Sequence, residues 1–249
     1  MKGTGIRRWL AAAGILLAGL HLCAAQDADG QIRAFQQEAG DNSVLYRGLQ
    51  APRYDFSANG HPYAVSTEFV VADIVSEGRL YRDIPLNIDA VAQCVVVRVP
   101  SGQASVALQP AQVDEVRMDG HLFTGIGPDD GSGLPAGIYE VIGPGGPECV
   151  YKLVQKQLRE TTTSVNGDRI GYYDPYYNPA LVHYFALSKS YYFRDAAGHF
   201  SRIRGRGALL RHLGERKAAV RRAWREAGLN GPDADFDLCC LTALSVAAQ

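Results

Sequence analysis

Short apolar runs separated by turn residues make up residues 44–206 of this chain. The strongest run is residues 93–99, in which Val95, Val97 and Val99 fall on one face of an extended chain. We therefore expect these three side chains to share one buried face. Similar runs typical of strands occur at residues 67–76, 78–81, 85–89, 104–108, 113–118, 121–123, 137–142, 149–157, 158–165, 180–187, 191–193 and 200–203.

Turn signals between these runs favour antiparallel pairing. Asp119-Gly120 and Asn166-Gly167 both stand between apolar runs, and such dipeptides form tight hairpin turns because both positions tolerate positive φ. No helical pattern alternates with the strands, as it would in a parallel sheet. The predicted fold is mainly β: a curved antiparallel meander, barrel-like or two-layered, over residues 44–206.

The apolar period changes after residue 206. Apolar residues then recur at helical spacings in two groups, which Gly228 and the Gly231-Pro232 pair separate. The first group is Leu209, Leu213, Val220 and Trp224, and the second is Phe236, Cys240 and Leu244. This pattern predicts a C-terminal α-helical hairpin over residues 207–249, packed on the sheet with Trp224 buried.

Residues 1–25 have the pattern of a signal peptide. Basic residues precede an apolar run over Trp9–Leu22, and small residues stand before Gln26. Cleavage before Gln26 predicts an exported protein, either in the periplasm, associated with the outer membrane, or secreted. The alternatives are a permanent anchor, a lipid on Cys23 and a twin-arginine signal. The apolar run is shorter than the ~20 residues that span a bilayer, so we expect no stable transmembrane span after cleavage.

The segment that follows the cleavage site, residues 26–43, is polar and weakly periodic. We expect a flexible leader there, with one helical turn around Ile32 and Phe35. Structure proper is then expected to begin near residue 44.

Charge and cysteine content argue against two classes of function. The chain of 249 residues has 25 basic and 26 acidic side chains, and cleavage removes three basic residues and no acid. The mature chain is therefore acidic, which together with export argues against a nucleic-acid partner.

The four remaining cysteines, Cys94, Cys149, Cys239 and Cys240, lack the paired spacing of zinc ligands. We expect four buried free thiols, with a Cys94–Cys149 disulfide as the alternative, and neither a metal nor a cofactor.

An ordered set of short motifs resembles an uncharacterised family of exported proteins common in anaerobic gut-type Gram-negative bacteria. The motifs are Gly60–Tyr63, Gly78–Asp89, Val95–Val97, Gly120–Phe123, Gly137–Val141, Tyr191–Phe193 and the basic helix through Trp224. The resemblance covers roughly residues 44–247. It implies an envelope or secreted location, and it carries over no catalytic residue.

Tyrosine is concentrated between residues 172 and 192, where seven of the 13 tyrosines lie. Tyrosine offers a rigid apolar face with a polar tip, which suits glycan stacking or a protein interface. The alternative is ordinary strand composition. The candidate ligand-binding residues are Tyr172, Tyr173, Tyr176 and Tyr177.

A basic run between residues 202 and 225 contains nine Lys and Arg residues, with only Glu215 opposing them. Such a stripe attracts acidic partners or lipid head groups. The alternative is the solvated face of an amphipathic helix. The candidate partner-binding residues are Arg216, Lys217, Arg221 and Arg225.

These features together favour a non-enzymatic, envelope-associated binding or interaction module, with an envelope protein, a lipid or a glycan as partner. One alternative is a lipid or lipoprotein carrier, in which an incomplete β-barrel holds acyl chains. Another is a hydrolase that uses scattered pairs such as His61 with Asp89 or His121 with Asp119. Whether the concave face of the sheet is hollow, packed or capped by the C-terminal helices distinguishes these functions.

Overall fold

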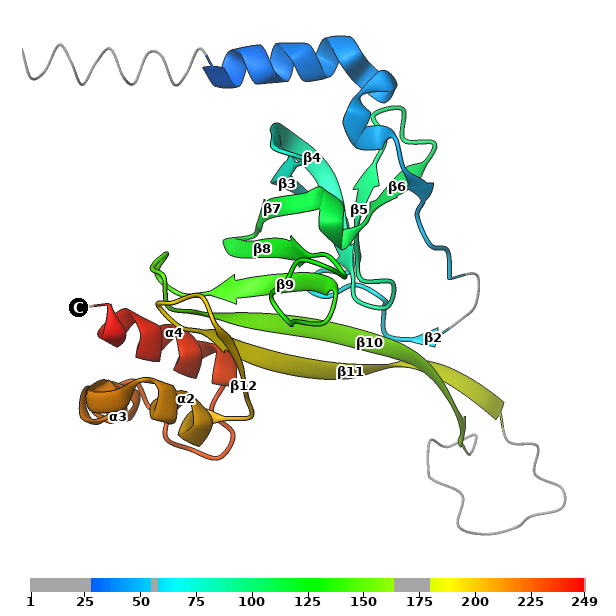
Figure 1. The fold of residues 1–249 in the computed structure, drawn as a ribbon. Coiled ribbons are helices and arrows are strands. Elements are labelled where there is room, and N and C mark those ends of the chain that lie inside the picture. The colour runs from blue at the N-terminus through cyan, green and yellow to red at the C-terminus, as the bar shows by residue number, and fades with distance from the viewer. Residues whose placement is uncertain (1–27, 55–57, 164–179, 249) are drawn as a thin grey trace, which may run out of the picture.

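The computed structural model describes residues 28–54, 58–163 and 180–248. In these residues one 12-stranded sheet has the order β1-β6-β5-β4-β3-β7-β8-β9-β10-β11-β12, and β2 pairs with β11 (Figure 1). The sheet is mostly antiparallel and is not closed into a barrel. The predicted mainly β fold is therefore confirmed, and the sheet is curled without forming a closed barrel.

The bounds of the strands match most of the predicted runs. They are β1 (Leu49–Gln50), β2 (Ala58–Asn59), β3 (Val70–Ser76), β4 (Arg79–Asp89), β5 (Cys94–Arg98), β6 (Ser105–Leu108), β7 (Val113–Met118), β8 (His121–Ile126), β9 (Gly137–Ile142), β10 (Cys149–Thr163), β11 (Ala180–Arg194) and β12 (Phe200–Ile203). The helices after the sheet are α2 (Arg206–His212), η4 (Gly214–Arg216), α3 (Lys217–Glu226) and α4 (Phe236–Ala247).

The meander is interrupted before β7. Strand β7 pairs with β3 rather than with β6, which precedes it in the chain. The connection is the short 3₁₀ helix η3 (Pro110–Gln112), which passes directly over β8. At Gly125 of β8 a Cβ atom would lie 2.0 Å from the carbonyl oxygen of Pro110. Glycine is therefore required there, because any side chain would collide with the crossing backbone.

The interior of the curled part, β3 to β9, is filled with side chains. Val95 and Val97 are fully buried there and Val99 packs against them, which confirms the predicted shared face. Other buried members of this cluster include Ile74, Leu86, Val116, Met118 and Phe123. Val96 points to the opposite face, where Phe69 and Ala51 cover it. Both faces of β5 are therefore buried.

A second core joins the C-terminal helices to the other end of the sheet. Leu209, Val220 and Leu244 pack there with Val150 and Phe193 of β10 and β11. The predicted helical pair is confirmed as α3 and α4, and the short α2 precedes it (Figure 1).

Trp224 is central to this second core. It is 3% exposed, and its Nε1 donates a hydrogen bond of 2.9 Å to the carbonyl oxygen of Cys239. The predicted burial of Trp224 is thus confirmed. Cys94, Cys149, Cys239 and Cys240 are all buried free thiols, as expected.

The N-terminal segment has more structure than its sequence predicts. Residues 28–39, expected within a flexible leader, form a helix that lies across one end of the curled sheet (Figure 1). Two 3₁₀ turns follow, η1 (Gly40–Asn42) and η2 (Val44–Tyr46), and Leu45 is buried in the first core. The predicted signal peptide, residues 1–25, lies outside the described residues. Among the helices that are described, none is long and apolar enough to cross a membrane.

Candidate functional site

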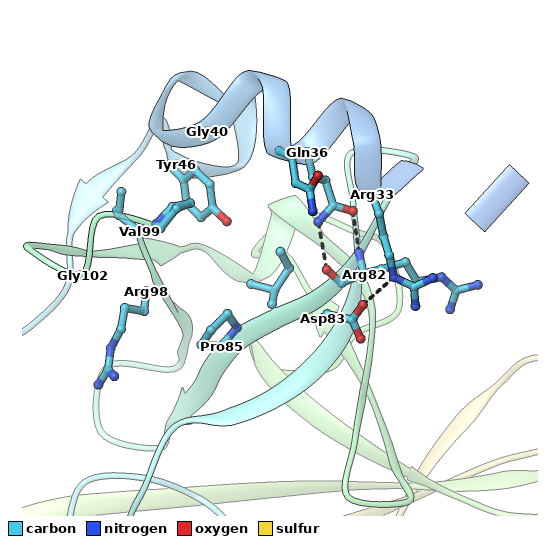
Figure 2. Close-up of a pocket in the computed structure, with 13 residues that line it drawn as sticks. Arg33, Gln36, Gly40, Tyr46, Arg82, Asp83, Pro85, Arg98, Val99 and Gly102 are labelled. Atoms are coloured by element: carbon cyan, nitrogen blue, oxygen red, sulfur yellow. Dashed lines mark hydrogen bonds and ion pairs between the residues drawn. The ribbon is translucent and has the colours of Figure 1, made fainter. Parts of the chain in front are cut away.

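The N-terminal helix is held on the sheet by polar contacts at a bulge in β4. The register between β3 and β4 shifts at Asp73, and Asp83 has a positive φ of 55°. The bulge leaves the backbone of Arg82 available, and the side-chain amide of Gln36 pairs with it. Gln36 Nε2 donates to the Arg82 carbonyl oxygen at 2.8 Å, and the Arg82 N–H donates to Gln36 Oε1 at 2.9 Å (Figure 2).

Ion pairs reinforce this contact. Arg33 of the helix donates to Asp83 at 2.7 Å, and Arg82 bridges Asp29 at 3.0 Å and Asp73 at 2.5 Å. The hydrogen bond with Asp83 raises the pKa of Arg33, and the hydrogen bond with Asp73 raises the pKa of Arg82. Both guanidinium groups are thus held in place by carboxylates.

A groove of about 530 Å³ lies between this helix and the sheet (Figure 2). We call it the helix groove. Its apolar surface comes from Tyr46, Ile84, Pro85 and Val99, and its charged lining is Arg33, Arg82, Arg98 and Asp83. The ends of β-barrels and curled sheets are common ligand sites because strands and loops there surround a concave surface.

Arg98 differs from the other two arginines of the groove. It belongs to β5, on the side of the groove away from Arg33, and its guanidinium carbon lies 4.2 Å from the ring centroid of Phe69. Within the described residues it has no carboxylate partner. A cation that is held by an aromatic ring but not neutralised is well suited to pair with an incoming anion.

Tyr46 supplies the other polar group of the helix groove. Burial and the charge of Asp41 raise the pKa of its hydroxyl, so the group remains protonated and available as a hydrogen-bond donor. Neither histidine nor cysteine is among the described residues that line the groove. Its chemistry therefore favours binding of a molecule with an apolar body and an anionic group.

The sequence-predicted site residues do not meet in the helix groove. Tyr172, Tyr173, Tyr176 and Tyr177 lie outside the described residues. The other four belong to η4 and α3, at the opposite end of the sheet from the N-terminal helix (Figure 1).

The four basic residues have different roles. Arg216 forms a two-pronged ion pair with Glu148 at 2.7 and 2.8 Å and donates to the carbonyl oxygen of Ala247 at 3.0 Å. It therefore fastens the helices to the β9–β10 turn. Lys217 is half-buried, whereas Arg221 and Arg225 are exposed on α3 and have no ion pair within the described residues.

The predicted His–Asp pairs do not form. The carboxylate of Asp89 accepts hydrogen bonds from the Tyr54 hydroxyl at 2.8 and 3.0 Å and from two backbone N–H groups, and none from His61. Burial, with the nearby charge of Lys156, lowers the pKa of His61. His121 binds Glu140 at 2.7 Å rather than Asp119.

A buried charge network, which was not among the predicted sites, connects α4 to the sheet. Lys152 of β10 is 7% exposed and donates to Glu140 at 2.5 Å and to Asp237 at 2.8 Å. The hydroxyl of Tyr191 donates to Asp237 at 2.8 Å. Period two places Lys152 on the same strand face as Val150 and Val154, so a buried lysine was detectable in the sequence.

Burial alone would lower the pKa of Lys152, but the hydrogen bonds to Asp237 and Glu140 leave it raised. The lysine is thus charged and fully paired. Since each of its carboxylate partners is also engaged by the protein, this network fastens α4 rather than forming an open site.

The helix groove could not be found from apolar periodicity, because its covering helix is attached through Arg33 and Gln36 rather than through an apolar stripe.

A comparison of the chain with protein-family models, with curated proteins and with solved structures found no match.

Proposed function

We propose that this protein is an exported, envelope-associated binding module, and that the helix groove binds a small amphipathic anion. Export rests on the signal-peptide pattern of residues 1–25. The observation that carries the binding proposal is Arg98, an arginine of the groove lining whose guanidinium stacks on Phe69 and has no carboxylate partner in the described residues.

The alternatives receive less support. A lipid carrier needs a chamber for acyl chains, but Val97, Val116, Phe123 and their neighbours fill the curl of the sheet. A surface groove is therefore the better ligand site. A hydrolase built on His61 and Asp89 lacks the hydrogen bond between base and carboxylate on which such a mechanism depends.

The test uses 1-anilinonaphthalene-8-sulfonate, a fluorescent anion with an aromatic body, titrated into the purified protein. Saturable binding is expected, and Arg98→Gln should weaken it about tenfold because a charge-assisted hydrogen bond is lost. Arg225→Gln, which removes an exposed arginine of α3, is the matched control and should leave binding unchanged.

Thermal melting of both variants checks that the fold is intact, since partly unfolded chains also bind this dye. Equal binding by wild type and Arg98→Gln, or non-saturable binding by the folded protein, would refute the assignment of the groove.

A further inference from the structure

Strand β11 has an unpaired stretch on its outer edge. Its inner edge pairs with β10 along its whole length. On the outer edge β2 pairs with His183 and Tyr184, and β12 pairs with Tyr191–Arg194. Residues 185–190 between them have no strand partner on this edge in the described part of the chain.

This unpaired stretch, which we call the β11 slot, spans roughly 20 Å at the usual rise per residue of a strand. Alternate residues of a strand direct their N–H and C=O groups to one edge, so the slot offers a row of backbone donors and acceptors. Gly60, directly after β2, still lies against Phe185, and the ring of Tyr54 packs edge-on against the same side chain. Beyond Gly60 the chain turns away from this edge, since the N–H of Ala64 bonds to the carbonyl oxygen of Ile88 in β4.

Strands β2 and β12 pair with the same edge of β11 on either side of the slot, which leaves room between them for one extended segment of a few residues. The side chains of Leu187, Ser188 and Lys189 in the slot are exposed. An unpaired strand edge of this kind can pair with a single strand from another molecule.

A cationic groove of about 460 Å³ lies where the slot meets β12. Its basic residues are Lys189, Arg202, Arg204 and Arg206, and Phe236 contributes an apolar wall. Arg202 reaches only the hydroxyl of Ser190, at 3.4 Å, and Arg206 donates to the carbonyl oxygen of Leu229.

Few acidic side chains neutralise the positive charge of this groove. Within the described residues Arg202, Arg204 and Arg206 have no ion pair. Lys189 lies 4.0 Å from Asp237, which is already bound by Lys152 and Tyr191. The groove is therefore complementary to negative charge.

From these two features we propose that the β11 slot binds an extended acidic segment of a partner protein by strand addition, with its Asp or Glu side chains in the cationic groove. Backbone hydrogen bonds supply part of the affinity in this mode of recognition, and side-chain groups select the sequence. The backbone edge favours a peptide over a lipid or a glycan, neither of which presents a strand. This surface is separate from the helix groove and does not depend on the function proposed for it.

The test measures binding of a fluorescent, end-capped peptide of alternating Glu and Val residues by anisotropy, with the full protein. Saturable binding is expected. A Lys/Val peptide should bind at least about tenfold more weakly because its charge is opposite. The same Glu/Val peptide with alternate backbone nitrogens methylated keeps its charge but cannot pair as a strand, and it should not bind.

A charge-reversed pair of variants locates the site. Arg202→Glu combined with Arg204→Glu should weaken binding about tenfold or more. Arg211→Glu combined with Arg222→Glu, on α2 and α3, changes the net charge equally and should leave binding unchanged. All four arginines are exposed, so both variants should fold, and thermal melting confirms this. Hydrogen exchange should show that the peptide protects amides within residues 185–190.

Three results would overturn the proposal. Equal binding of the methylated peptide would mean that no strand forms. An equal loss in both double variants would mean that only net charge matters. A lack of saturable binding, or of protection within the slot, would mean that this edge does not accept a peptide.

Discussion

Replacing Lys152 with methionine tests whether the buried charge network fastens α4 to the sheet. Methionine keeps the length and apolar character of the side chain but removes its charge. Glu140 then remains buried, with a side chain 9% exposed, and keeps His121 as its partner. Asp237, 26% exposed, keeps Tyr191 and the more distant Lys189.

The expected loss of unfolding free energy follows from this geometry. Removing one partner of a buried ion pair costs about 3–5 kcal/mol, because the other charge is left buried and unpaired. Since Asp237 is partly hydrated and Glu140 keeps His121, we expect the lower end, about 3 kcal/mol. Lys189→Met is the matched control: that lysine is 44% exposed and 4.0 Å from the same Asp237. Its loss should cost less than about 1 kcal/mol.

Urea unfolding followed by tryptophan fluorescence provides the assay. Trp9 lies in the predicted signal peptide, so the protein is prepared from Gln26 onward, and Trp224, buried beside α4, is then its single tryptophan. A loss below about 1 kcal/mol for Lys152→Met, or an equal loss for Lys189→Met, would refute the structural role of the network.

The difference in unfolding free energy between wild type and Lys152→Met should depend on pH with a definite sign. Burial alone would raise the pKa of Asp237, but hydrogen bonds from Lys152 and Tyr191 hold it below the ordinary value of 3.8. A depressed pKa gives stability that is present above pH 3.8 and lost as the pH falls through the folded-state value. The difference between wild type and Lys152→Met should therefore be largest near neutral pH and shrink below pH 3.8. A difference that grows on acidification would contradict this account.

Three further predictions test the core and export. Val97→Asp should cost several kcal/mol, because it buries a charge inside the filled curl, and an unchanged melting temperature would mean that the strand is not buried there. Trp224→Ala should cost about 3–5 kcal/mol in chemical unfolding, from lost apolar contact and the cavity left behind, whereas a separately mobile helical pair would give a second transition instead. N-terminal sequencing of the protein recovered outside the cytoplasm should begin at Gln26, and recovery of intact Met1 there would exclude cleavage.

The sequence predicted where strands lie better than where they end. Residues 78–81 and 85–89 were expected as two runs, but they belong to the single strand β4. Pro85 lies inside it and is tolerated because β5 begins to pair with β4 only at Leu86. A proline usually indicates a strand boundary, so local chemistry alone could not join these runs.

The ends of β11, the strand that carries the proposed peptide site, were also not predicted from the sequence. The polar residues Ser188, Lys189 and Ser190 separate two apolar runs, and they resemble a break in the sequence. In the structure they continue one strand whose outer edge is unpaired. Apolar alternation detects strands that are covered by a core, and it does not detect a strand exposed to solvent on both faces.

The second core also constrains when the molecule can finish folding. It combines Ile142 and Val150 of β9 and β10 with Cys240 and Leu244 of α4, which are separated by about a hundred residues of chain. Because α4 is synthesised after every strand of the sheet, these apolar strand faces have no cover until α4 has emerged. Contacts between such distant residues form slowly. The export proposed above would require a chain that is still unfolded, and the delay between the synthesis of β9 and that of α4 leaves this core incomplete during that interval.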